Sequence, residues 1–393
     1  MKALYVCNRG EKGGATKSLL NLVFQLSRMG VEPYVLTPNK NGYVKEFCIK
    51  NNIKCFYVKY YEIGYSLNTS FIKRWIKILL YPFLWTLNVI YNYFQVYKVK
   101  QIIPIEEIEI IHTNVNRDNF GILLSKKYKI PNIMHLREFG TLDFECYYLR
   151  HNIYEYYSNS VDFFIAISKS IKNFYLKKGI PSTKIVTIYN GIDTNSIIPK
   201  KDDNLVADFF KIIMIGGISE NKGQIQVVEA LNLLSNNERK NIIVDFYGTG
   251  DNKYILKLKE KIKKYNLSNN FNFKGYQNNV NEVINKYDIA IMASKSEAFG
   301  RVTIEYMMAN VAVIASDTGA NIELINNKKN GLLYHYNDFQ DLKNKINLLK
   351  NNKEFCRKIA QNGCKNSKKY TSEINAKSIY KLYKEVLNEN KNK

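Results

Sequence analysis

Two glutamates stand at opposite ends of a short stretch whose residue types suit a ligand that carries both phosphates and hydroxyl groups. Residues 294–305 read Ser-Lys-Ser-Glu-Ala-Phe-Gly-Arg-Val-Thr-Ile-Glu. They follow an apolar run that is typical of a buried parallel strand, and they continue as a helix. Free N–H groups at the start of such a helix favour phosphate, while carboxylates accept hydrogen bonds from sugar hydroxyls. Glu297 and Glu305 can therefore face one crevice, unless Glu297 only caps the helix and Glu305 is a solvated helix residue.

A second group of ionisable residues lies near the ends of two expected strands in the first half of the chain. His112 ends one apolar run, and His135, Arg137 and Glu138 end the next. In α/β folds the carboxyl ends of parallel strands carry the chemistry. A lone histidine is more often structural, but three ionisable residues within four positions favour a binding or catalytic site.

Glycine-rich loops follow the first expected strand of each half. Gly13 and Gly14 close the loop 8–14 before a helix, although neither the G-x-G-x-x-G fingerprint nor the P-loop pattern fits there. Lys222 follows the apolar run 211–217 and precedes another helix, so its ammonium group can meet a diphosphate. The alternatives are a plain tight turn for the first loop and an exposed lysine in the second.

The composition is that of a globular protein with room for two domains. The chain has 393 residues, of which 46% are hydrophobic and 24% are charged. Its net charge of +23 is spread over both halves without a basic arm, which argues against a nucleic-acid binder and favours a general attraction to anionic surfaces. Six cysteines and four histidines show neither metal-binding nor disulfide spacing, and the first residues show no signal peptide. We therefore expect a cytoplasmic protein.

An uncharged aromatic segment interrupts the first half of the chain. Residues 78–97 carry no charge and are rich in Tyr, Phe, Trp and Leu, with cationic residues shortly before and after them. A membrane-spanning helix needs about 20 mostly apolar residues, and Pro82 and several polar residues interrupt this run. Aromatic residues beside cations are typical of a helix in the plane of a membrane surface. The interpretations of segment 71–100 are thus a surface helix, a helix buried in the fold, or a membrane span, which its polar residues disfavour.

Expected strands and helices alternate throughout, which predicts parallel α/β layers in both halves. Residues 197–208 have weak periodicity and read as a linker. We therefore expect a first domain at residues 1–198 and a second at residues 205–369. The polar, amphipathic tail at residues 370–393 is expected to form a helix that packs across the two halves or back on the first.

Taken together, six short motifs resemble those of the family 4 glycosyltransferases in order and spacing, over nearly the whole chain. The resemblance implies the GT-B fold, in which two Rossmann-like domains face each other across a cleft and the C-terminal helix crosses back to the first domain. The motifs are the Gly13-Gly14 loop, Asn190-Gly-Ile-Asp193, Ile215-Gly-Gly-Ile-Ser-Glu-Asn-Lys-Gly223, the E-x7-E stretch 294–305, Val313-Ile-Ala-Ser316 with Gly319 and Glu323, and Asn330-Gly-Leu-Leu333.

The resemblance implies that the second domain binds a nucleoside-diphosphate sugar as donor and the first domain binds the acceptor. By this analogy Glu297 contacts the donor sugar, Glu305 the ribose and Lys222 the diphosphate. Further donor contacts carried over from the family are Gly13, Gly14, Gly217, Phe299, Gly300 and Arg301 near the phosphates, and Gly275 and Tyr276 near the base.

Two positions depart from the family pattern. The family usually has arginine where Gly217 stands, so Arg301 or Arg9 would supply the missing cation. The family's histidine after the proline-led strand has no single counterpart, so His135 or Arg137 would act at the reacting centre, with Glu138 orienting it. No Asp-x-Asp sequence occurs, and we expect neither a metal ion nor another cofactor.

The implied function is that of a retaining, hexosyltransferase-type enzyme that moves a sugar to a hydroxyl of a saccharide, lipid-linked, in surface polysaccharide biosynthesis. It would work in the cytoplasm, peripherally at the inner face of the cell membrane, with segment 71–100 as the contact to anionic lipid. A sugar-nucleotide epimerase of the same fold, which needs no acceptor, is one alternative. A non-catalytic nucleotide-sugar-binding or scaffold protein is another, and the missing arginine at position 217 favours it.

Overall fold

The computed structural model describes residues 1–66, 71–140, 146–148, 150, 152–195, 197–200, 209–277 and 279–391. The chain divides into two compact units. Unit 1 consists of Met1–Gly191 with Ser372–Lys393, and unit 2 consists of Ile192–Thr371.

Residues 192–200 belong to unit 2, whereas the sequence pattern assigned residues up to 198 to the first domain. The reason is hydrogen bonding. The N–H of Ile192 donates to the carbonyl of Tyr370 at 2.9 Å, and the N–H of Lys200 donates to the carbonyl of Ala309 at 2.8 Å. Of the expected linker, residues 201–208 lie outside the described part of the chain.

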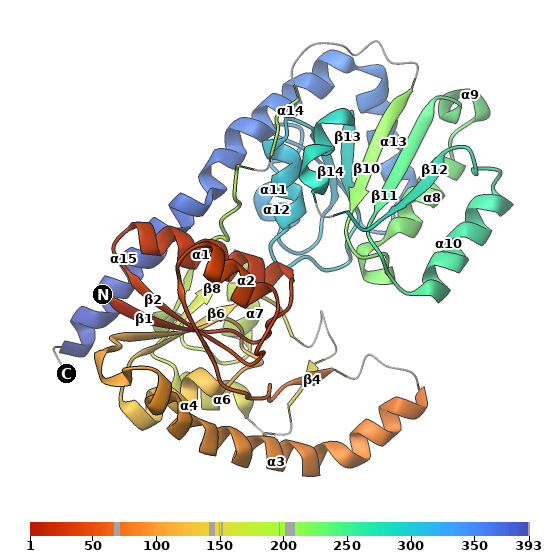
Figure 1. Cartoon of the computed structure of the whole chain (residues 1–393). Coiled ribbons are helices and arrows are strands. Elements are labelled where there is room, and N and C mark those ends of the chain that lie inside the picture. Colours follow the sequence, from red (N-terminus) through yellow and green to blue (C-terminus); the bar gives the residue numbers. More distant parts are fainter. Residues whose placement is uncertain are drawn as a thin grey trace. The chain divides into compact units, whose positions relative to one another are not determined.

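A parallel sheet of seven strands forms the centre of unit 1, in the order β3-β2-β1-β5-β6-β8-β9 (Figure 1). Its central strands are buried along nearly their whole length because helices cover both faces. The strands are β1 (Lys2–Val6), β2 (Glu32–Thr37), β3 (Lys54–Tyr57), β5 (Ile110–Thr113), β6 (Asn132–Leu136), β8 (Phe163–Ala166) and β9 (Ile185–Thr187), beside a short antiparallel pair, β4 (Tyr65–Ser66) and β7 (Cys146–Tyr147). The helices are α1 (Gly14–Arg28), α2 (Tyr43–Lys50), α3 (Phe71–Ile102), α4 (Phe120–Tyr128), α6 (Ile153–Ser160), α7 (Lys169–Lys177) and α15 (Ser372–Lys391).

The C-terminal helix α15 packs on α1 and completes one hydrophobic core of unit 1 (Figure 1). The prediction that this helix returns to the first domain is confirmed. Its buried side chains are Ala376, Ile379, Leu382, Tyr383 and Val386.

Unit 2 is a second parallel sheet, of six strands in the order β12-β11-β10-β13-β14-β15. Its strands are β10 (Phe210–Ile215), β11 (Ile242–Tyr247), β12 (Phe271–Gly275), β13 (Ile289–Met292), β14 (Ala312–Ser316) and β15 (Leu332–Tyr334). Its helices are α8 (Gln224–Asn232), α9 (Asn236–Arg239), α10 (Asn252–Lys264), α11 (Arg301–Met308), α12 (Asn321–Leu324), α13 (Phe339–Asn351) and α14 (Lys353–Ser367).

In each sheet the strand order reverses beside the first strand of the unit. Strands β2 and β5 flank β1, and strands β11 and β13 flank β10. Parallel α/β sheets bind ligands outside the carboxyl ends of their strands at such a reversal. The loops after β1 and β5, and those after β10 and β13, are therefore the ones positioned for binding.

The aromatic segment of the first half forms one long helix, α3, with Pro82 inside it. One face of α3 is buried and the opposite face is exposed, so the interpretation as a helix buried in the fold fits one face only. None of the helices in the described part of the chain is long and apolar enough to cross a membrane.

Candidate functional site

A lysine and a glutamate form an ion pair at the strand-order reversal of unit 2. Lys222 ends the short turn η3 (Glu220–Lys222) after β10, and Glu297 lies in the loop after β13. Lys222 Nζ lies 2.8 Å from Glu297 Oε2, and the two side chains are 30% and 14% exposed. The other carboxylate oxygen, Oε1, accepts a hydrogen bond from the N–H of Gly300 at 3.1 Å. A solvent-accessible cation beside a carboxylate suits a ligand that carries both phosphate and hydroxyl groups.

The Glu297 loop is held by the segment that follows β14. The hydroxyls of Ser316 and Thr318 donate to the carbonyl of Ser294 at 2.8 and 2.6 Å. Gly319 has a φ of +53°, and a Cβ at this position would lie 2.3 Å from the carbonyl oxygen of Glu297. Because only glycine fits so close to that backbone, Gly319 fixes where the glutamate stands.

Helix α11 begins immediately after this loop. Glu305 lies one turn into the helix and is 8% exposed, and its Oε1 is 3.3 Å from a terminal nitrogen (Nη2) of Arg301. Phe299 is buried, with its ring edge-on to that of Tyr370 at a centroid distance of 6.1 Å. The structure thus brings the predicted residues 297–305 together at one loop–helix junction.

The other predicted donor positions lie at the same edge of the sheet. Gly217 follows β10, and its carbonyl accepts a hydrogen bond from the Gln224 side chain at 3.0 Å. A Cβ on Gly217 would meet only the Thr249 carbonyl, at 3.8 Å, so space is open beside it. Gly275 ends β12 with a φ of +67°, and Tyr276 after it is 58% exposed. β12 is the edge strand, so these two residues lie two strands away from β10.

The histidines of unit 1 form a buried hydrogen-bonded chain. His112 Nδ1 lies 2.6 Å from the Tyr383 hydroxyl, and His112 Nε2 lies 3.0 Å from His135 Nδ1. An Arg137 terminal nitrogen (Nη2) lies 3.1 Å from the same His135 nitrogen. Since arginine can only donate, His135 Nδ1 is an acceptor, His112 Nε2 donates to it, and the Tyr383 hydroxyl donates to His112 Nδ1.

Burial governs the charge of both imidazoles. Burial first, and the charge of Arg137 second, lower the pKa of His112 to about 3. The pKa of His135 also lies well below its usual value, first through burial and then through Arg137 and His112. Both rings are therefore neutral at physiological pH.

Arg137 and Glu138, the other two predicted residues of unit 1, are also buried. The Nε and one terminal N–H of Arg137 donate to the side-chain oxygens of Asn114 and Asn190 at 2.7 and 2.6 Å. Glu138 pairs with Arg117 instead, at 2.5 Å from its Nε. The structure therefore links Arg137 and His135 directly and gives Glu138 a different partner.

The Gly13-Gly14 loop lies at the carboxyl end of β1. Gly13 caps helix α1 with a φ of −152°, which any residue can adopt. Nothing lies within 4 Å of a Cβ built on Gly13 or Gly14. Neither glycine is required by the fold, and their effect is to leave the surface of this loop open.

Two family descriptions match the chain one after the other. "Glycosyltransferase Family 4" matches residues 12–196, and "Glycosyl transferases group 1" matches residues 198–366. An uncharacterised glycosyltransferase of Methanocaldococcus jannaschii is 30% identical over 295 residues, which cover 74% of this chain and 79% of that protein. The chain belongs to the family 4 glycosyltransferases.

The similarity to relatives and to solved structures covers most of this glycosyltransferase. The N,N'-diacetylbacillosaminyl-diphospho-undecaprenol alpha-1,3-N-acetylgalactosaminyltransferase of Campylobacter jejuni is 26% identical over 79% of this chain and 86% of that protein. HepE of Anabaena, solved with UDP, is 20% identical with a TM-score of 0.79 over 98% of this chain and 100% of that one. The sucrose-phosphate synthase of Thermosynechococcus elongatus is 16% identical with a TM-score of 0.73, over 98% and 99%. The glycosyltransferase has the two-domain GT-B fold.

Sequence reasoning missed a cluster of ionisable residues in unit 1 of the glycosyltransferase. Besides Glu138, Arg117 contacts Glu62 at 3.6 Å, and Glu62 contacts Arg9 at 3.4 Å. Burial raises the pKa of neighbouring Asp118 to about 8, against a hydrogen bond from the Phe120 N–H that lowers it. The signal was available, because residues 113–119, all polar except Val115, follow the apolar run that ends at His112.

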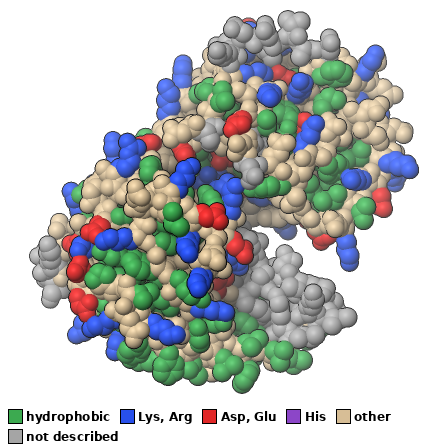
Figure 2. All heavy atoms as spheres, viewed as in Figure 1, with side chains coloured by type: hydrophobic (Ala, Val, Ile, Leu, Met, Phe, Trp, Pro, Cys, Tyr) green, Lys and Arg blue, Asp and Glu red, His purple; other side chains and the backbone are tan. Residues whose placement is uncertain are grey.

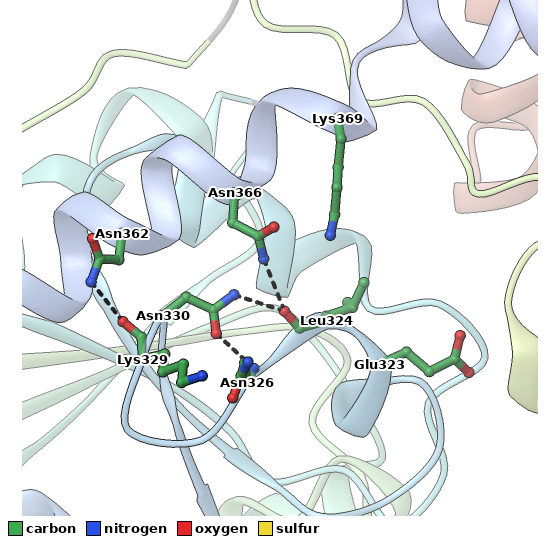
Figure 3. Close-up of a pocket in the computed structure, with 8 residues that line it drawn as sticks. All are labelled: Glu323, Leu324, Asn326, Lys329, Asn330, Asn362, Asn366 and Lys369. Carbon is green, nitrogen blue, oxygen red and sulfur yellow. Dashed lines mark hydrogen bonds between the residues drawn. The ribbon is translucent and has the colours of Figure 1, made fainter.

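A hollow of about 340 Å³ lies elsewhere in unit 2 (Figure 3). The Asn330 amide that lines it donates to the Leu324 carbonyl at 3.1 Å, and the Asn362 amide donates to the Lys329 carbonyl at 2.9 Å. These amides hold the main chain of the turn before β15, which gives Asn330 of the Asn-Gly motif a structural role. Among the described residues, no three His, Cys, Asp or Glu side chains are grouped so as to hold a metal ion.

Proposed function

We propose that this glycosyltransferase moves a sugar from a nucleoside-diphosphate sugar to a hydroxyl group of a saccharide, with retention of the anomeric configuration. The observation that carries the proposal is the ion pair of Lys222 and Glu297 beside the strand-order reversal of unit 2. A donor of this kind combines a diphosphate, which needs cations and N–H groups, with hydroxyls, which need carboxylate acceptors.

The pair gives each partner a role in the reaction. Lys222 neutralises the charge that develops on the departing diphosphate, so the leaving group needs no metal ion. When the diphosphate binds Lys222 in place of Glu297, the Glu297 carboxylate is released to accept hydrogen bonds from the sugar hydroxyls. Arg301, at the start of α11, supplies the second cation, which the family's arginine would provide at the position of Gly217.

The nucleoside extends from this pair along the carboxyl edge of the sheet. Glu305 accepts hydrogen bonds from the ribose hydroxyls, and the base lies beside Gly275 and the exposed ring of Tyr276. Solved structures of HepE contain UDP or UDP-glucose, which supports a uridine nucleotide as the first donor to test. In unit 1 we assign the reacting-centre role to Arg137, because His135 is fully buried whereas Arg137, which contacts it, is 7% exposed.

Two relatives suggest the acceptor. The name of the C. jejuni relative describes transfer to a saccharide on diphospho-undecaprenol. A 23% identical relative in Staphylococcus aureus is named a capsular polysaccharide biosynthesis glycosyltransferase. We therefore propose a lipid-linked saccharide acceptor in surface polysaccharide assembly, on the cytoplasmic side of the membrane.

The first experiment is a thermal-shift panel of UDP-, GDP- and dTDP-sugars, because a ligand that binds the folded state raises its melting temperature. With the best donor, Lys222→Met and Glu297→Gln should each lower sugar transfer by about 100-fold or more. Lys263→Met changes an exposed lysine of helix α10 and serves as the matched control. Transfer should also persist with a metal chelator present.

Products separate this function from the alternatives. An epimerase would convert the donor with no acceptor present, whereas a transferase releases nucleoside diphosphate and extends the acceptor. The glycine at position 217, where the family usually has an arginine, favours a non-catalytic binding protein as the second candidate. That candidate is excluded if nucleoside diphosphate release depends on Lys222 and Glu297, and adopted if both variants bind donor normally and neither they nor the wild type turn it over.

A further inference from the structure

Helix α3 buries two polar side chains on its inner face and leaves large apolar side chains exposed on its outer face. On its inner face Asn92 is completely buried and Gln95 is 5% exposed. On its outer face Leu79, Phe83 and Phe94 are 76%, 66% and 62% exposed. A surface helix of a water-soluble protein has the reverse pattern.

Specific contacts fix this orientation. The Asn92 amide accepts a hydrogen bond from the N–H of Tyr61 at 2.9 Å and donates one to the Tyr61 carbonyl at 2.8 Å. The Tyr81 hydroxyl donates to the Ile63 carbonyl at 2.6 Å, and Val96 and Val99 join the hydrophobic core beneath. Rotating α3 to hide its outer face would break these bonds and leave the Tyr61 backbone groups without their Asn92 partner.

The outer face is one continuous stripe. Its members recur every three or four residues, so they line one side of the helix. Half of the large exposed hydrophobic side chains in the described part of the chain lie on this single helix. Figure 2 shows them gathered along the lower edge of the molecule, where Figure 1 draws α3. The stripe is Leu79, Phe83, Leu87, Ile90, Phe94 and Tyr97.

The charged residues within α3 are all cationic, and Glu106 just beyond its end pairs with Lys100 at 2.7 Å. No Asp or Glu occurs from residue 71 to residue 105, whereas Lys or Arg stands at positions 73, 74, 77, 98 and 100. On the adjacent helix α4, the Lys127 ammonium lies 4.6 Å from the centre of the Tyr97 ring. An apolar centre with cations at both ends complements a surface that is apolar inside and anionic outside.

We propose that α3 lies in the plane of an anionic lipid surface, with the stripe from Leu79 to Tyr97 inserted between the headgroups. At 1.5 Å per residue this stretch covers about 28 Å. A second copy of the chain fits less well, because stacking two such stripes in either direction brings cationic ends together. The proposal does not rest on the donor site, because lipid binding is measured with no substrate present.

The chain carries its own reporter for this contact, since both of its tryptophans, Trp75 and Trp85, lie on α3. Purified full-length protein is mixed with vesicles of phosphatidylcholine alone, or with about a third phosphatidylglycerol, a composition chosen for its anionic surface. We expect co-flotation with the anionic vesicles, a blue shift of tryptophan emission, and quenching by brominated lipid. Added salt should weaken the binding.

The double variant Phe83→Ser/Phe94→Ser should lower vesicle binding by tenfold or more while keeping the wild-type melting temperature, because both rings face outward. Ile49→Ser/Leu256→Ser, which changes two equally exposed apolar side chains on α2 and α10, is the matched control and should bind as the wild type does. Thermal shift by donor should be unchanged in both.

Three results would overturn the proposal. One is a wild-type protein that stays unbound to anionic vesicles, and another is a Phe83/Phe94 double variant that binds them as tightly as wild type. The third is sedimentation of lipid-free wild type as a dimer that becomes a monomer in this double variant, which would assign the stripe to a second copy. If no donor raises the melting temperature of the wild type, that result would count against the donor site and not against the lipid contact.

Discussion

Because both histidines are neutral, the buried chain of hydrogen bonds from Tyr383 to His135 in unit 1 runs in one direction. From Tyr383 through His112 to His135, each group donates to the next, and Arg137 donates to the same His135 nitrogen. A proton added to His135 Nδ1 would face two donors with no acceptor. The low pKa values of both rings follow from burial and from this guanidinium.

Acid should therefore destabilise unit 1. Below about pH 6.5 the unfolded chain binds protons that the folded histidines exclude, so stability is present above that pH and is lost as the pH falls toward about 3, the folded pKa of His112. Between pH 6.5 and 5, wild type should lose about 2 kcal/mol more than His112→Gln does. Urea unfolding at each pH measures this. His335→Gln removes an exposed histidine whose pKa Asp317 raises, so its loss of stability should be no smaller than that of wild type. An unchanged slope in His112→Gln would contradict the prediction.

At the residue scale the sequence predicted Lys222 and Glu297 but not their pairing. The two residues meet only because β10 and β13 are neighbours in the sheet. Alternation of strands and helices does not specify which strands lie side by side. The same limit hid Arg117, whose partners Glu62 and Glu138 stand far from it in the sequence.

Among the elements, the turn after β14 positions the Glu297 loop through one glycine. Gly319→Ala should lower the free energy of unfolding by more than about 1 kcal/mol and reduce transfer, since a Cβ at φ +53° would collide with the Glu297 backbone. Gly30→Ala measures strain without collision, because Gly30 has a φ of +86° and nothing within 4 Å of an added Cβ. Equal losses of stability and activity in both variants would show that the contact with Glu297 does not matter.

Helix α3 illustrates which properties of an element can be read from sequence. Its length, its aromatic content and its cationic ends were evident, but its orientation was not. Asn92 and Gln95 looked like polar interruptions that weakened a membrane interpretation. In the structure they form the inner face, and Asn92 binds the Tyr61 backbone. A hydrophobic pattern gives the period of a helix, whereas long-range hydrogen bonds decide which side faces the protein.

For the whole molecule, the two crossings of the chain between the units pass beside each other. Ile192 forms a parallel bridge with Thr371 in unit 2. In unit 1, a Cβ on Gly191 would lie 2.5 Å from the Ser372 Cα, and the Asn375 amide donates to the Tyr189 carbonyl at 2.7 Å. The start of the C-terminal helix therefore packs against the Asn-Gly-Ile-Asp motif and the residue before it.

Removing residues 372–393 should destabilise unit 1 while leaving unit 2 folded, because α15 contributes core side chains to unit 1 only. Hydrogen exchange read by mass spectrometry should show faster exchange in β1, β2 and β5 and unchanged protection in β10 to β14. If the truncated chain is insoluble, Leu382→Ala gives a milder form of the same test. It should cost about 2–5 kcal/mol and speed exchange in unit 1 alone, whereas the exposed Lys381→Ala should not. Equal loss of protection in both units would mean that they unfold together and that α15 stabilises the chain as one body.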